Sequence, residues 1–274
     1  MDAQALQAAA DAIRSAQALV ITAGAGMGVD SGLPDFRGPQ GFWRAYPAYQ
    51  KLGLRFEELA NPRWFAQDPE LAWGFYGHRL NLYRATQPHA GFSILKKWAA
   101  TKTHGAFVVT SNVDGHFQKA GFDPARVFEV HGSLLHMQCV KNCGVGIFPG
   151  DKIEIAVDPE SFRAKAPLPA CPSCRNLARP NVLMFGDYAH DATRSHEQRD
   201  RFQDWLSELE SGIVVIELGA GSNVPTIRIF SEQISNMRDA RLIRINLRES
   251  EVPRGEMGLA GGALEVLQSL DSLL

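Results

Sequence analysis

The sequence predicts an α/β protein built on a doubly wound, Rossmann-like parallel sheet. The evidence is three short apolar stretches, each followed by glycine or polar residues: Ala18–Thr22, Ala106–Thr110 and Ile213–Leu218. Strands of this kind are buried on both faces, and ligands bind beyond their carboxyl ends. We therefore expect the residues that follow these strands to meet in one crevice.

The first strand is predicted to open a nucleotide site. An alanine-rich helix over residues 3–16 precedes it, and Gly24-Ala25-Gly26 follows it. Backbone amides at such a turn can hold a pyrophosphate beside a helix start, although a tight structural turn explains a lone G-x-G equally well. Residues 42–56 predict no strand and supply no acidic group for a ribose, so hydride transfer is disfavoured.

Residues 39–84 form a predicted helical insertion, rich in aromatic residues and proline. Asp68-Pro69-Glu70 is a favourable helix start, which predicts a helix from Pro69 to about Arg84. On it, Tyr76 and Arg79 share a face. A phenol beside a guanidinium can hold a carboxylate, whereas the competing interpretation is a core tyrosine and a solvated arginine.

Other predicted elements place further polar groups at the same edge of the sheet. A second amphipathic helix is expected over residues 89–101, and the last helix over 259–271. Polar or glycine-rich residues follow each strand. They are Ser111-Asn112-Val113-Asp114 after Ala106–Thr110, His131 after Val127–Val130, Gly219-Ala220-Gly221-Ser222 after Ile213–Leu218, and Asn246 after Leu242–Ile245.

His131 is the candidate general base. A neutral imidazole near pH 7 can take a proton from a hydroxyl group. A single histidine at a strand end is more commonly a satisfied structural group, and the polar residues expected around it favour the functional interpretation.

The four cysteines of the chain predict a structural zinc site. They form two close pairs, Cys139/Cys143 and Cys171/Cys174, in a chain without an evident export signal. Two such knuckles supply four thiolates in tetrahedral geometry, which leaves no open position for catalysis. Four unrelated buried cysteines are the alternative. We expect a small zinc-binding module over residues 135–179.

Bulk composition excludes several classes of function. The chain has 274 residues, 45% hydrophobic and 21% charged, and a formal net charge of −2. It has no basic run for nucleic acid and no apolar stretch that could span a bilayer, so neither partner is expected. The N-terminal residues lack the features of a signal peptide or presequence, which favours a cytoplasmic protein.

The predicted Rossmann-like domain comprises 1–38, 85–134 and 180–274, with the insertion at 39–84.

Seven blocks of this sequence, in order, resemble the sirtuins, the NAD-dependent protein lysine deacylases. They are GAGMGVDSGLPDFRGPQGFW, TSNVDGHFQKAG, EVHGS, the paired cysteines, RPNVLMFGD, GAGSNVP and INLRE. The resemblance covers nearly the whole chain, and the SGLPDFR and HGS blocks with the cysteine pairs are its most specific parts. The Tyr76-x-x-Arg79 spacing is similar to that of the subgroup that removes malonyl, succinyl and glutaryl groups.

The resemblance implies an NAD site, a catalytic group and a substrate-binding segment. It implies cofactor contacts from Gly24, Ala25, Gly26, Asp35, Phe36, Arg37, Ser111, Asn112, Asp114, Gly219, Gly221, Ser222, Asn246 and Glu249. His131 is implied as the general base, with Asn112 and Asp114 beside the nicotinamide and its ribose. Substrate contacts are implied for Tyr76, Arg79, Val182, Phe185 and Gly186.

The implied reaction transfers an acyl group from lysine to ADP-ribose and releases nicotinamide, with acylated protein lysine as the partner. An ADP-ribosyltransferase or NAD hydrolase on the same scaffold is the first alternative, and a non-catalytic NAD-sensing module is the second. Two departures from the family motivate the first alternative: Ser111 in place of glutamine, and Asp187-Tyr188-Ala189-His190-Asp191 in the substrate segment. A further departure is His116-Phe117 in place of Leu-His.

Overall fold

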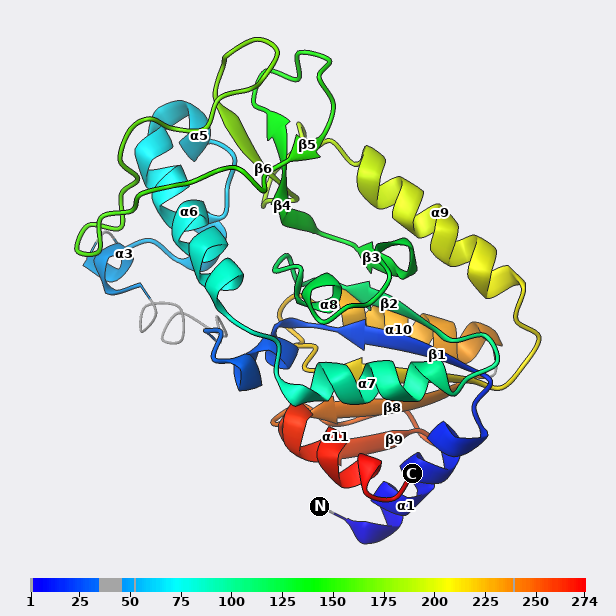
Figure 1. Cartoon of the computed structure of the whole chain (residues 1–274). Coiled ribbons are helices and arrows are strands. Elements are labelled where there is room, and N and C mark those ends of the chain that lie inside the picture. The colour runs from blue at the N-terminus through cyan, green and yellow to red at the C-terminus, as the bar shows by residue number, and fades with distance from the viewer. Residues whose placement is uncertain (1, 35–45, 52, 239) are drawn as a thin grey trace.

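The centre of the protein is a six-stranded parallel sheet, shown in the computed structural model of Figure 1. The structure describes residues 2–34, 46–51, 53–238 and 240–274. The strand order is β3-β2-β1-β7-β8-β9. The strands are β1 (Ala18–Ala23), β2 (Ala106–Thr110), β3 (Val127–Glu129), β7 (Ile213–Leu218), β8 (Arg241–Asn246) and β9 (Met257–Ala260).

Strand β1 lies at the point where the order of the sheet reverses. All six of its residues are buried. It pairs in parallel with β2 on one side, with Leu19 opposite Ala106, and with β7 on the other, with Ala18 opposite Ile213. The chain therefore leaves β1 and β7 at the same edge but in opposite directions across the sheet, which opens a crevice between them.

Helices cover both faces of the sheet, as Figure 1 shows. One face packs on α1 (Ala3–Ser15), α7 (Ala90–Ala100) and α11 (Ala263–Asp271), and the other on α9 (Thr193–Ser207) and α10 (Thr226–Arg238). Successive side chains of a strand point to opposite faces, so Ile21 joins the first core and Val20 the second. Burial on both faces explains the continuous apolar runs of these strands.

A smaller unit lies above the carboxyl edge of the sheet in Figure 1. It contains an antiparallel sheet of order β5-β4-β6. Its strands are β4 (Gly132–Cys139), β5 (Phe148–Pro149) and β6 (Ala178–Val182), and the helices beside it are α3 (Pro47–Lys51), α4 (Phe56–Leu59), α5 (Trp64–Gln67) and α6 (Pro69–Ala85). Trp73, Tyr76, Leu134 and Met137 belong to its apolar core. Short elements complete the chain: η1 (Ala25–Ser31), α8 (His116–Lys119) and η2 (Pro124–Arg126).

Most predicted elements are confirmed, within one or two residues at their ends. Helix α6 begins as expected, because Asp68 caps it through the Leu71 amide and Pro69 is its first residue. The prediction of one helix over 259–271 is wrong at its start, since Met257–Ala260 is a strand parallel to β8. That strand buries only alternate residues over four positions, which is too short a pattern to recognise. No helix among the described residues has the length and apolar character needed to cross a membrane.

The sequence did not predict helices α8, α9 and α10, nor strands β4, β5 and β6 of the smaller sheet. Helix α9 buries Gln198, Phe202, Trp205 and Leu206 among many charged residues, so its periodic apolar signal is weak. Strand β6 contains Arg179 and Pro180, which are poor signals for a strand. The boundaries drawn for the domains stay predictions.

A buried ion pair joins the second half of the sheet. Arg244 on β8 donates to both carboxylate oxygens of Glu217 on β7, at 2.6 and 3.0 Å. The two side chains are 1% and 0% exposed. Glu232 on α10 accepts a third bond from Arg244 at 2.8 Å, so the guanidinium ties two strands to a helix. A charge buried at this depth is stable only while it is paired.

We predict that Arg244→Met lowers the free energy of unfolding by about 3–5 kcal/mol, because it leaves the Glu217 carboxylate buried without its partner. Urea denaturation measures this change. Arg241→Met is the control at the exposed start of the same strand, and it should change stability by less than about 0.5 kcal/mol. Equal effects of the two substitutions would show that the buried pair contributes nothing particular.

Candidate active site

A cavity of about 550 Å³ opens at the carboxyl edge of the parallel sheet, beneath the smaller unit. Residues that follow β1, β2, β3 and β7 form one side of it, and α6 with the segment after β6 forms the other. The predicted convergence of strand ends is therefore confirmed for four strands. The lining residues from those strand ends are Gly24, Ala25, Ser111, Asn112, Asp114, His131, Gly219, Gly221 and Ser222.

Glycines allow the loops after β1 and β7 to touch. A Cβ atom on Gly24 would lie 2.7 Å from the Ala220 Cα, and one on Gly219 would lie 2.5 Å from Gly26. Gly219 also has a φ of +60°, a conformation that favours glycine. The amides of Gly24 and Gly26 donate to the carbonyls of Leu218 and Gly219. These two amides thus join the loops, and the role predicted for the glycine turn in holding a pyrophosphate stays a prediction.

Asn112 is anchored to the neighbouring strand end. Its side-chain amide donates to the Gly24 carbonyl at 2.9 Å, and its backbone amide donates to the Thr110 hydroxyl at 3.0 Å. Thr110 in turn donates to the Ala23 carbonyl. The side chains of Asn112 and Thr110 therefore both bond to the end of β1 and the residue after it. Asn112 is partly buried in the cavity wall.

Asp114 lies on the same loop and also lines the cavity. Burial raises the pKa of its carboxyl group above the ordinary value, while His116 and Arg79 act in the opposite direction. One carboxylate oxygen accepts from the His116 amide at 2.9 Å. The His116 ring is buried, and neither ring nitrogen has a hydrogen-bond partner in the part of the chain that the structure describes. Its contacts are the rings of Tyr83 and Phe92.

His131 faces the cavity from the turn after β3. Burial lowers the pKa of its imidazole below the ordinary value, a hydrogen bond to the Ser111 backbone partly offsets this, and His190 lowers it further. The ring is therefore neutral at pH 7, as a general base must be. Its Nε2 lies 3.5 Å from the Thr226 hydroxyl at the start of α10.

The glycine after His131 is required by the backbone. Gly132 has a φ of +77°, and a Cβ atom there would lie 2.1 Å from the Asn181 carbonyl oxygen. The chain can therefore turn from β3 into β4 and pair at once with β6, while the His131 carbonyl accepts from the Leu183 amide at 3.0 Å. This pairing fixes the histidine between the two units of the protein.

Tyr76 and Arg79 line the cavity from α6, as their predicted shared face requires. Their exposed fractions are 1% and 7%, so the arginine is not solvated. The guanidinium donates to the Tyr83 hydroxyl and lies over the rings of Phe56 and Phe75, 5.9 and 5.2 Å from the ring centres. Burial raises the pKa of the Tyr76 phenol. This end of the cavity therefore combines a fixed cation with neutral hydroxyl groups.

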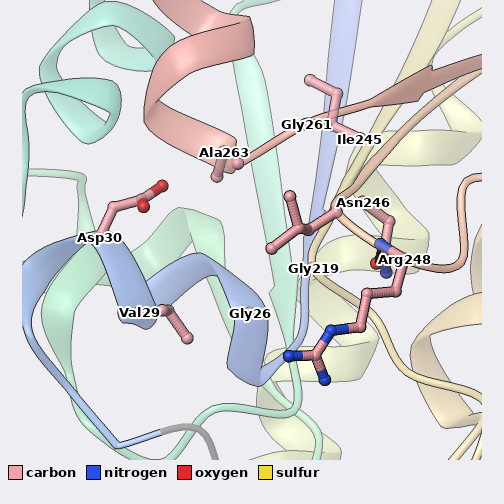
Figure 2. Close-up of a pocket in the computed structure, with 11 residues that line it drawn as sticks. Gly26, Val29, Asp30, Gly219, Ile245, Asn246, Arg248, Gly261 and Ala263 are labelled. Atoms are coloured by element: carbon pink, nitrogen blue, oxygen red, sulfur yellow. Dashed lines mark hydrogen bonds between the residues drawn. The ribbon is translucent and has the colours of Figure 1, made fainter.

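A second, smaller hollow of about 60 Å³ continues from the cavity along the sheet edge. Figure 2 shows it between η1, the ends of β7 and β8, and the start of α11. Gly219 and Arg248 line both hollows, whereas Gly26 and Asn246 line only the smaller one. The predicted site residues are thus divided between two hollows that share part of their walls.

Asn246 acts mainly within the protein. It is 1% exposed, and its side chain donates to the Ala220 carbonyl at 2.8 Å and accepts from the amides of Arg248 and Glu249. Glu249 accepts from the amide and the hydroxyl of Ser222, at 2.9 and 2.8 Å. Asn246 and Glu249 therefore shape the loop on which Ser222 lies.

The segment after β6 forms the outer wall of the cavity. Val182 is buried there and Phe185 is 41% exposed, while Gly186 lies just beyond, with a φ of +69°. The departure at Asp187 has a structural explanation, because its carboxylate forms an ion pair with Arg179, whose side chain is 3% exposed. This ion pair therefore attaches the segment to β6.

The four cysteine thiols form one cluster. All four sulfur atoms lie within 4.8 Å of one another, and the closest pairs are 3.5 and 3.6 Å apart. Zinc–sulfur bonds of about 2.3 Å at tetrahedral angles place sulfur atoms about 3.8 Å apart. The donor set and its spacing suit structural zinc. The predicted ligands Cys139, Cys143, Cys171 and Cys174 thus lie together at the far end of the smaller unit.

Some residues lie outside this description, and others were missed. The predicted cofactor contacts Asp35, Phe36 and Arg37 fall outside the described residues. Tyr83, Thr226 and Arg248 line the cavity or contact His131, and they were not predicted from the sequence. Tyr83 follows Arg79 by four positions on one helix, a spacing that could have identified it.

Comparison with known proteins gives one consistent family. The Sir2 family model matches residues 24–219. "NAD-dependent protein deacylase 2" of Pyrobaculum aerophilum is 33% identical over 264 residues, which is 95% of this chain and 92% of that protein. The mitochondrial "NAD-dependent protein deacylase sirtuin-5" of Canis lupus familiaris is 32% identical over 239 residues, 80% of this chain and 70% of that protein.

Solved structures agree with this result. A mutant Sir2 homologue in complex with ADP-ribose has a TM-score of 0.72 and 29% sequence identity, and the match covers 100% of this chain and 96% of that chain. A Sir2 homologue in complex with NAD has a TM-score of 0.70 at the same identity, covering 99% and 93%. The chain belongs to the Sir2 family.

Proposed function

We propose that this protein removes acyl groups from protein lysines with NAD as co-substrate. The observation that carries the proposal is the convergence of His131, Asn112 and Asp114 on one cavity at the switch point between β1 and β7. Relatives named NAD-dependent protein deacylases, similar over more than nine tenths of this chain, support it. Polar groups from the ends of neighbouring strands in one cavity are typical of a catalytic site in an open α/β sheet.

In this proposal NAD supplies the ribose that accepts the acyl oxygen, and nicotinamide leaves. The loops after β1 and β7, with Ser222 and Glu249, bind the dinucleotide along the sheet edge. Asn112 is held by the Gly24 carbonyl and lines the nicotinamide end. His131 is neutral at pH 7 and takes a proton from a ribose hydroxyl. The smaller unit covers this centre and excludes water.

The substrate enters between the two units. We propose that the peptide pairs with the segment that contains Val182, Phe185 and Gly186, by the strand addition common in peptide recognition. The acyl chain then extends toward α6, where Tyr76 and Arg79 lie. A buried guanidinium at that position favours an acyl group that ends in a carboxylate, such as succinyl or malonyl. The cytoplasmic location expected from the sequence stays a prediction.

Dependence on the acyl substrate separates deacylation from the alternatives. We predict that wild-type protein with NAD releases nicotinamide only when an acyl-lysine peptide is present. His131→Ala should lower the rate of deacylation by at least about 100-fold, because it removes the neutral imidazole that is proposed to take the ribose proton. A coupled nicotinamide assay, read beside mass spectrometry of the peptide, measures both rates.

The alternatives give different results in the same assay. Rapid release without peptide would identify an NAD hydrolase, and labelling of a protein acceptor would identify an ADP-ribosyltransferase. An unchanged rate in His131→Ala would exclude this histidine as the base. Binding of NAD without any release would support the non-catalytic alternative.

The charge of Arg79 should set the preference for the acyl chain. We predict that Arg79→Met lowers kcat/KM for a succinyl-lysine peptide by about 100-fold and changes that for the acetyl-lysine peptide by less than about threefold. Arg79→Lys keeps the charge but loses the two-pronged geometry, so an intermediate loss is expected. Equal losses on both peptides would contradict an acidic-acyl pocket.

We propose further that the four cysteine thiolates hold one structural zinc ion. Zinc there would join the end of β4 to the residues just before β6, two strands that pair with each other, and Val182 at the end of β6 lines the cavity. Every position of the tetrahedron is a protein ligand, so the ion has no part in the chemical step.

Removal of the metal should therefore unfold the smaller unit. We predict about one zinc per chain in purified protein, and a large fall in melting temperature and in deacylation after chelation or in Cys171→Ala. Atomic absorption and thermal denaturation measure these changes. His131→Ala is the control and should retain its zinc, since that residue is not a ligand. Protein that is free of zinc and equally stable would refute the proposal.

A further inference from the structure

Tyr83 is hydrogen-bonded to the Arg79 guanidinium in the wall of the main cavity. It lies one turn beyond Arg79 on α6, and its hydroxyl oxygen accepts from Nε of the guanidinium at 3.0 Å and from Nη2 at 2.9 Å. The exposed fractions of the two residues are 7% for Arg79 and 6% for Tyr83. Both line the main cavity. The bond is therefore part of the pocket wall and not a contact on the surface of the helix.

Two bonds to one oxygen orient the plane of the guanidinium. A planar group that shares one edge with a fixed oxygen can no longer rotate freely about its long side chain. The rings of Phe56 and Phe75 lie against it as well, which is a favourable arrangement for an arginine. Tyr83 itself is restricted, because a tyrosine has few rotatable bonds and this one is buried. The geometry of Arg79 is thus set before any substrate arrives.

The neutral charge of the Tyr83 hydroxyl matters as well as its position. A phenol hydroxyl is neutral, so it orients the guanidinium without cancelling its charge. Burial raises the pKa of the Tyr83 phenol above its ordinary value, more than the nearby Arg79 lowers it, and the group therefore stays protonated at pH 7. A carboxylate in the same place would instead form an ion pair and weaken the attraction for an anionic ligand.

We propose that Tyr83 is a positioning residue for acidic acyl groups: it holds the Arg79 guanidinium in the orientation that a terminal carboxylate requires. This inference rests on the proposed function of Arg79. The competing interpretation is that Tyr83 only packs α6 against its neighbours. Packing alone affects every acyl chain to the same extent, whereas positioning affects only those that reach Arg79 with a charge.

Removal of one oxygen atom tests the two interpretations. Tyr83→Phe keeps the ring, and with it the wall of the pocket and the contact to His116. With saturating NAD, we expect the KM for a succinyl-lysine peptide to rise by about tenfold, in line with the loss of hydrogen bonds to a charged group. The kcat for that peptide, and both constants for the acetyl-lysine peptide of the same sequence, should stay within about twofold.

Tyr49→Phe is the matched control. Tyr49 is another buried tyrosine of the smaller unit, and its hydroxyl donates to the Phe162 carbonyl at 2.9 Å, away from the residues that line the cavity. This variant reports the general effect of losing a buried phenol hydroxyl. Its ratio of succinyl to acetyl turnover should equal that of wild type, and melting temperatures should show that both variants are folded.

The outcomes separate the inference from the function on which it rests. If Tyr83→Phe leaves the ratio unchanged, or lowers both activities equally, while Arg79→Met abolishes the succinyl preference, then Tyr83 does not position the arginine and the acidic-acyl pocket stands. If Arg79→Met also leaves the ratio unchanged, the acidic-acyl proposal fails, and the role of Tyr83 fails with it. A selective rise in the succinyl KM for Tyr83→Phe alone, beside an unchanged Tyr49→Phe, supports positioning.

Discussion

The parallel pairing of β1 with β7 is the constraint on which the site depends. Parallel neighbours end at one edge, so the two loops that leave them must begin side by side although the chain then departs in opposite directions. Side chains would force these loops apart. Gly24 and Gly219 remove the obstacle, and their loops approach until backbone atoms of one touch those of the other. The floor of the cavity is therefore backbone, which suits close approach of a dinucleotide.

The same edge explains why the candidate site residues are held by neighbouring strand ends as well as by their own loops. Asn112 follows β2 but is bonded to the carbonyl of Gly24, after β1. His131 follows β3 and is hydrogen-bonded to the backbone of Ser111, after β2. Asn246, at the end of β8, holds the carbonyl of Ala220, after β7. Residues at the end of each strand are thus held by residues at the end of the neighbouring strand. The geometry of the site therefore depends on the register of the strands.

This arrangement also explains what the sequence could and could not predict. The central strands were predictable because burial on both faces leaves continuous apolar runs, and the polar residues after them had to meet at one edge. The hydrogen-bond partners of the residues at that edge were less predictable. The amides of Gly24 and Gly26 were assigned to phosphate, yet they bond to carbonyls of β7 and its loop, a contact between residues almost 200 positions apart. Strand β6 and its ion pair from Arg179 to Asp187 were missed, because arginine and proline in a strand are explained only by their partners.

The proposed peptide-binding segment is in contact with the proposed acyl pocket. Phe185, on the proposed peptide-binding segment, donates its amide to the Ala60 carbonyl, and its own carbonyl accepts from the Asn61 side chain. Its ring also meets the ring of Phe56, which in turn lies beside the Arg79 guanidinium. A displacement of the peptide segment therefore reaches the acyl pocket through one aromatic ring. Because Phe56 lies between Phe185 and the Arg79 guanidinium, the proposed binding mode couples the position of the peptide to the position of the acyl chain.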